Sequence, residues 1–133
     1  MQKNRTSAEG DTKISVNNGS RNIDRFSEGQ WLTMKSLPDA GLPHGVYHLA
    51  DAAKAAKNVH PQTFGGQVVH VDQNSVYQLS GKDIVQHERG LFAKEPVVGQ
   101  CYEVSYRRGI GTVKGELSLA EGAKLDHQRS RSL

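Results

Sequence analysis

Cysteine, proline and aromatic residues are all scarce in this chain of 133 residues, and the scarcity of cysteine excludes the most. Cys101 is the only cysteine, so neither an intrachain disulfide nor a cysteine-rich zinc site can form. A reducing compartment suits such a chain. We therefore expect the protein to be cytoplasmic.

Long apolar runs are also missing. No stretch approaches the ~18 apolar residues that a membrane-spanning helix needs, and the N-terminal segment MQKNRTSAEGDTKIS lacks the apolar core of a secretory signal. We expect no membrane association. The net charge is only +3 with a pI near 9.1, and the basic residues are dispersed. Such a charge weakly favours an acidic partner and does not by itself indicate nucleic-acid binding.

Apolar residues make up only 35% of the chain and the mean hydropathy is -0.62, values that are low for a chain folded from end to end. We therefore predict a central domain between less ordered ends. Residues 1–22 are predicted as a disordered leader and residues 115–133 as a flexible tail. From Glu116 onward this tail is expected to form a frayed helix or to remain disordered. Residues 23–44 are predicted as a short apolar extension, with a helix capped by Ser27 or Asp24, followed by a linker.

The apolar extension carries more large side chains than a linker requires. We predict that they dock on the central domain or on a partner protein. These partner-docking candidates are Phe26, Trp31, Leu32 and Met34.

The predicted domain, residues 45–114, consists mainly of short β-branched and aromatic runs separated by turn residues, a pattern typical of an antiparallel meander. An alanine-rich stretch at residues 51–58 predicts one short helix. The fold class is therefore mainly β (α+β): a small antiparallel β-meander or barrel-like domain. The expected strands are GVYHL (45–49), QVVHV (67–71), VYQL (76–79), IVQH (84–87), and a hairpin that turns at Gly109 and Gly111.

These strand and turn positions resemble the KfrB domain of plasmid and other mobile-element proteins. The resemblance implies a cytoplasmic role in plasmid maintenance or conjugation and implies no established reaction. The matching positions are Gly66, Val68, Val69, Val76, Tyr77, Gln78, Val85, His87, Leu91, Gly99, Val104, Tyr106 and Gly109.

His87 is the most conspicuous titratable residue of the domain because it lies between Gln86 and Glu88, with Arg89 following. Alternation along a strand would place His87 and Arg89 on one face and Glu88 on the other. Glu88 therefore cannot orient the imidazole, and any function of His87 would need a partner from another strand, such as Gln78 or Glu103. A structural role, in which His87 bonds across the sheet and Arg89 caps a turn, is favoured over binding, and binding over catalysis.

No metal or cofactor is expected. The six histidines lack the spacing that places two ligands on one helical face. Cys101 is predicted to be a small buried residue of a strand.

A second set of candidates could bind nucleic acid. If the strands curl into a small barrel, Tyr106 and the other tyrosines could stack on bases while basic residues near the hairpin contact phosphates. The basic candidates are Arg107, Arg108 and Lys114. Core packing is the ordinary role of strand tyrosines, and Arg107 and Arg108 also suit a solvated hairpin tip.

The predicted function is a non-catalytic accessory or adaptor module of a plasmid or other mobile element, with a plasmid-encoded protein as its partner. One alternative is a nucleic-acid-binding regulator. A second alternative is a small enzyme or enzyme modulator that uses His87.

Overall fold

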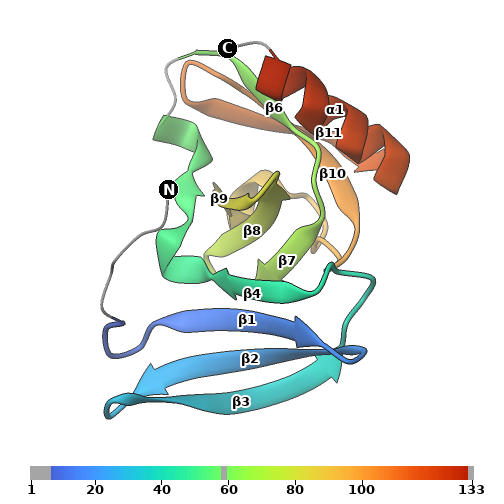
Figure 1. The fold of residues 1–133 in the computed structure, drawn as a ribbon. Coiled ribbons are helices and arrows are strands. Elements are labelled where there is room, and N and C mark those ends of the chain that lie inside the picture. Colours follow the sequence, from blue (N-terminus) through green and yellow to red (C-terminus); the bar gives the residue numbers. More distant parts are fainter. Residues whose placement is uncertain (1–6, 58–59, 132–133) are drawn as a thin grey trace. The chain divides into compact units, whose positions relative to one another are not determined.

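The protein is described here by a computed structural model that covers residues 7–57 and 60–131 (Figure 1). The chain divides into two compact units, Met1–Asp51 and Ala52–Leu133. The division falls after the strand GVYHL, whereas the sequence analysis placed a boundary before Gly45.

The described part of the N-terminal unit forms one antiparallel sheet of four strands in the order β3-β2-β1-β4. Two-residue turns close its hairpins at Asn18-Gly19 and Glu28-Gly29, where all four φ values are positive. Buried Ile14 and Val16 lie on one face of β1. The elements are β1 (Thr12–Asn17), β2 (Ser20–Ser27), β3 (Gln30–Pro38), β4 (Gly45–His48) and the 3-10 turn η1 (Leu49–Asp51).

Two predictions for this region are wrong. The described part of the leader predicted over residues 1–22 contains β1 and the start of β2, while residues 1–6 lie outside the described residues. The helix predicted within residues 23–37 is instead the hairpin of β2 and β3. The pairing of β2 with β3 across the sheet, with Phe26 opposite Trp31, overrides the helical spacing of the apolar residues.

The described residues of the C-terminal unit form two sheets, β11-β10-β6 and β5-β9-β8-β7. Strands β7, β8 and β9 make the predicted antiparallel meander, and β10 and β11 make the predicted hairpin. Strand β5 pairs in parallel with β9. The strands are β5 (Ala53–Lys54), β6 (Gln62–Phe64), β7 (Val68–Val71), β8 (Ser75–Ser80), β9 (Asp83–Glu88), β10 (Cys101–Arg107) and β11 (Ile110–Leu117).

Side chains from both sheets meet in one core. Phe64, Val104 and Tyr106 come from the first sheet, and Val76 and Val85 come from the second. The prediction of a mainly β fold is confirmed. Within the described residues, however, the strands form separate sheets and no closed barrel, because β6 and β11 end one sheet while β5 and β7 end the other.

The described part of the alanine-rich stretch, predicted as one short helix over residues 51–58, does not form a continuous helix. It contains β5 and the 3-10 turn η2 (Ala55–Lys57), and Asn58 lies outside the described residues. Ala55 is buried in the core, and the preceding strand β5 pairs with β9. These contacts hold the segment at the edge of the sheet. Helix propensity is a weak preference that such tertiary contacts override.

The tail predicted as flexible instead contains α1 (Leu119–Arg131), which runs across β6, β10 and β11 (Figure 1). Ser118 and Glu121 form a reciprocal capping box: the Glu121 amide donates to Ser118 Oγ, and the Ser118 amide donates to Glu121 Oε1. These bonds to Ser118 lower the pKa of Glu121. Glycine at 122 permits the close approach, because a Cβ there would lie 2.1 Å from the Gly65 carbonyl oxygen. Residues 132–133 of the predicted tail lie outside the described residues.

Candidate functional site

Strand β9 directs His87 into the core of the C-terminal unit. His87 is 1% exposed, whereas its neighbour Glu88 is exposed, so the expected separation of these two residues onto opposite faces is confirmed. Arg89 departs from the prediction, since β9 ends at Glu88 and Arg89 begins the 3-10 turn η3 (Arg89–Leu91). Arg89 does not share a strand face with His87, and its guanidinium donates to the Phe92 carbonyl at 3.2 Å, as expected for a turn-capping residue.

Both ring nitrogens of His87 make short hydrogen bonds. Nε2 lies 2.6 Å from Gln78 Oε1, and Nδ1 lies 2.6 Å from the Tyr106 hydroxyl. The Gln78 amide nitrogen donates to the carbonyls of Gly66 and Tyr102, which turns Oε1 toward the imidazole. Nε2 therefore carries the proton and donates to Gln78, and Tyr106 donates to Nδ1.

Three aromatic rings enclose the imidazole. The Tyr106 ring stacks on it at 5.5 Å between centroids, while Phe64 and Phe92 approach edge-on at 5.7 and 6.4 Å. This burial lowers the pKa of His87 to about 4, because the charged imidazolium would lose its hydration. Burial, reinforced by the Glu88 carboxylate, raises the pKa of Tyr106 to about 12. Both groups are therefore neutral near pH 7.

A cavity of about 130 Å³ adjoins this pair. It is lined by Lys54, Ala56, Ser75, Gln86, His87, Glu88 and Tyr106. The only lone pair that His87 could use as a base is already engaged by Tyr106. The arrangement stabilises the junction of β8, β9 and β10, and it offers no free base to a bound molecule.

Gln78, a partner for His87 expected from another strand, lies on β8 and bonds to the imidazole as predicted. The bond between His87 and Tyr106 was not predicted. Strand alternation predicts the face to which a residue points, but it does not predict which residues of two different sheets meet across a core.

The basic candidates lie on the other side of β10. Because Tyr102, Val104 and Tyr106 point into the core, Ser105 and Arg107 face outward. A groove of about 590 Å³ follows this outward side of the sheet beside α1. Its lining consists of Pro61, Gln62, Thr63, Ser105, Tyr106, Arg107, Ile110, Thr112, Lys114 and Leu125.

Arg108 occupies an adjoining hollow of about 350 Å³, lined also by Arg107, Ile110 and Thr112. The structure thus brings Arg107, Arg108 and Lys114 to one side of the hairpin. Tyr106 and Tyr102 are 3% and 8% exposed, so the expectation that these two rings stack on bases is wrong. They are core residues, as the alternative interpretation had it.

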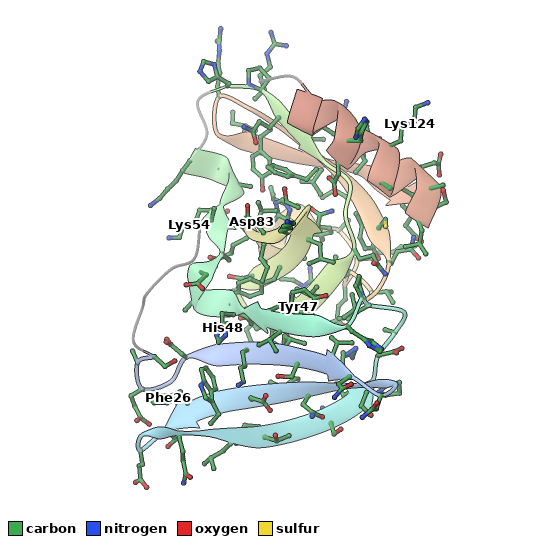
Figure 2. The ribbon with its side chains drawn as sticks, viewed as in Figure 1. Phe26, Tyr47, His48, Lys54, Asp83 and Lys124 are labelled. Carbon is green, nitrogen blue, oxygen red and sulfur yellow. The ribbon has the colours of Figure 1, made fainter. Side chains whose placement is uncertain are left out.

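The partner-docking candidates lie in the sheet of the N-terminal unit. Phe26 and Trp31 pair across β2 and β3 with an edge-to-face ring contact of 5.2 Å. The Lys13 ammonium lies 4.5 Å from the Trp31 ring centre, and His48 lies 5.7 Å from it. Figure 2 labels Phe26 and His48 of this cluster. The sequence analysis did not identify Lys13 or His48 as neighbours of Trp31.

Leu32 and Met34 are separated from this aromatic cluster. Leu32 follows Trp31 on β3 and therefore points to the opposite face. It is 42% exposed and Met34 is 61% exposed. The four predicted docking residues therefore do not share one face of the sheet. Phe26 and Trp31 belong to the aromatic cluster, and Leu32 and Met34 form an exposed apolar pair.

In the part of the chain that the structure describes, no group of three or more histidine, cysteine, aspartate or glutamate side chains is arranged to hold an ion. No helix among those described residues has the length and apolar character to cross a membrane.

Two comparisons with known proteins identify relatives of this chain. The family model for the KfrB domain matches residues 63–115, which run from β6 to β11. Protein TraB of Escherichia coli is 54% identical over 125 residues, which cover 94% of this chain and 86% of that protein. The similarity to TraB therefore extends through both units, whereas the domain match lies within the C-terminal unit.

Proposed function

Since the chain belongs to the KfrB domain family, we propose that it is a non-catalytic accessory or adaptor module of a plasmid or other mobile element. It acts in plasmid maintenance or conjugation by binding another protein encoded by the same element. The observation that carries this proposal is the exposed edge strand β3.

Strand β3 is the longest strand of its sheet and pairs, among the described residues, with β2 alone. Every residue from Leu32 to Ser36 is exposed. An exposed edge presents backbone donors and acceptors to which an extended segment of another protein can add as a further strand. Leu32 and Met34 supply apolar contacts beside that backbone, and methionine adapts readily to different partners.

The partner segment is accordingly an extended stretch with apolar side chains in alternating positions. Main-chain hydrogen bonds to β3 would provide affinity, and contacts with Leu32 and Met34 would provide specificity. The closed hydrogen-bond network around His87 supports the non-catalytic part of the proposal, since both ring nitrogens already have protein partners.

Affinity capture from cells that naturally encode the chain tests the proposal. The bait is the full chain, either unchanged or with Leu32→Lys and Met34→Lys, and the extract is treated with nuclease. We expect the unchanged chain to retain a specific protein and the double variant to lose it, because charges on an edge strand block strand addition.

Val97→Lys is the matched control, because Val97 is 62% exposed and lies outside the strands. It should retain the partner. Capture that survives the β3 substitutions unchanged, or that disappears entirely on nuclease treatment, would contradict protein binding through β3.

A further inference from the structure

The groove on the outward side of β6, β10 and β11 is a second surface, separate in sequence from β3. The sheet forms its floor, with Thr63, Ser105 and Thr112 each on a different strand. Helix α1 covers the neighbouring part of the same sheet side, where Gly122 meets Gly65 and Cys101, and Leu125 contributes to the groove lining. The groove is thus a trough bounded by a helix, with a volume typical of ligand sites.

The charge of this groove has one sign. Arg107 and Lys114 line it, and Arg108 lies in the adjoining hollow. Neither lining contains an aspartate or glutamate among the described residues. Glu103 lies on the same side of β10 as Ser105 but is not part of the lining. A concave surface lined by cations and by no carboxylate attracts a polyanion by focusing its positive potential.

The remaining lining supplies hydroxyl groups that can donate hydrogen bonds to phosphate oxygens. The Thr63 and Ser105 hydroxyls lie 3.1 Å apart on the floor, and Thr112 adds a third hydroxyl. Hydroxyl groups and guanidinium groups are common phosphate contacts in nucleic-acid complexes. The exposed Ile110, at 71%, lines the hollow together with both arginines and can contact a sugar or base without reading its edge.

We infer that this groove binds single-stranded nucleic acid through its phosphate groups, with little preference for base sequence. The lining lacks an exposed aromatic ring, since the ring of Tyr106 is buried, so base stacking does not contribute. The cations at the groove come from one hairpin, so they can contact only a short run of phosphates, which a single strand provides. The hydroxyl and guanidinium groups of the lining suit phosphate oxygens better than the flexible carboxylates of an acidic peptide.

Fluorescence anisotropy with a labelled oligothymidylate of about 12 nucleotides, within the site size of a small domain, tests this inference on the full chain. The groove variant is Arg107→Gln with Lys114→Gln, and its affinity should fall about tenfold or more. Between about 50 and about 200 mM salt, the slope of log affinity against log salt should shrink by about 1.4, since each lost single-strand phosphate contact removes about 0.7.

Lys82→Gln with Lys94→Gln is the matched control. It removes the same charge from two exposed residues outside the groove lining and should leave binding nearly unchanged. Thr112→Glu provides a second groove variant at an exposed position and should weaken binding as well. Circular dichroism checks that each variant is folded.

The inference would be overturned if the groove variant bound the oligonucleotide as tightly as the unchanged chain, or if the groove and control variants lost the same affinity. It would also be overturned if a duplex of the same length bound more tightly. A last contradicting result would be groove-dependent binding of polyglutamate without binding of the oligonucleotide. The Leu32→Lys, Met34→Lys variant should bind the oligonucleotide normally. Failure of the groove experiment therefore leaves the β3 proposal intact, and the reverse also holds.

Discussion

The two units differ in how they use polar side chains. In the C-terminal unit, Gln78 and His87 are each 1% exposed and bond to one another inside the core. In the N-terminal unit, buried Asp24 accepts hydrogen bonds from the Ser15 and Thr33 hydroxyls on a sheet whose outer strand β3 is almost wholly exposed. The first arrangement fixes one packing of two sheets, and the second leaves an edge available to a partner.

Removing the buried network should produce the largest effect. Gln78→Leu leaves the carbonyls of Gly66 and Tyr102 and the Nε2 proton of His87 without their partner, which we expect to cost about 3–5 kcal/mol of unfolding free energy. Asp24→Asn in the N-terminal unit keeps its shape and should cost less than about 1 kcal/mol. Urea unfolding measures both. Equal losses of unfolding free energy in the two variants would contradict the proposed difference between the units.

Acid should weaken the C-terminal unit through His87. The unfolded chain protonates this imidazole near pH 6.5, whereas the folded protein does so near pH 4. The contribution of His87 to the unfolding free energy is therefore fully present above pH 6.5 and is lost as the pH drops from 6.5 to about 4. The loss amounts to about 3 kcal/mol, at about 1.36 kcal/mol for each pKa unit. Urea unfolding across this range should show the loss.

His87→Gln removes the titrating group and should flatten that pH dependence. An NMR titration of the unchanged protein provides an independent check, because the His87 ring signals should not move above about pH 5. Signals that titrate near pH 6.5 would show that the imidazole is not held neutral by its surroundings.

Disturbing the α1 contact should produce a smaller effect. Gly122→Ala places a methyl group against the Gly65 carbonyl, and we expect a loss of about 1–3 kcal/mol despite the better helix propensity of alanine. Hydrogen exchange of the α1 amides should accelerate. Gly90→Ala, at a position with open space, is the control and should leave α1 unaffected.

The smallest expected effect lies in the aromatic cluster. Lys13→Met removes the ammonium above Trp31 and should reduce stability by about 0.5 kcal/mol. Trp31 is the only tryptophan of the chain, so its fluorescence reports on this unit in a urea titration. A loss as large as that of Gln78→Leu would mean that the N-terminal sheet depends on this contact as strongly as the core depends on Gln78.

Sequence alone predicted the C-terminal meander because Val76, Val85 and their neighbours alternate with polar residues between clear turn signals. It missed β1, whose polar composition resembled a leader, and it missed β2 and β3, whose apolar residues were interpreted as a helix. The signal was nevertheless present in the Asn18-Gly19 pair, which is typical of a two-residue hairpin. For α1 it left a frayed helix and disorder as alternatives, although Ser118 and Glu121 have the spacing of a capping box.

For the candidate sites, the sequence predicted which residues lie together along the chain but not which residues meet from distant strands. Adjacent positions such as Arg107 and Arg108 share a location by connectivity, so their common surface could be inferred from the hairpin. The contact of His87 with Tyr106, and that of Lys13 with Trp31, joins residues from strands that are distant in sequence. Such contacts depend on the packing of sheets and the twist of strands, which local periodicity does not specify.

Site-specific crosslinking at β3 tests the central claim most directly. Cys101 is buried and is the only cysteine, so Met34→Cys introduces a single accessible thiol for a photoactivatable crosslinker. The crosslinking is carried out in a nuclease-treated extract of cells that naturally encode the chain. The proposal predicts one discrete protein adduct from position 34 and none from Val97→Cys. No adduct from position 34, or the same adducts from both positions, would contradict partner binding at the β3 edge.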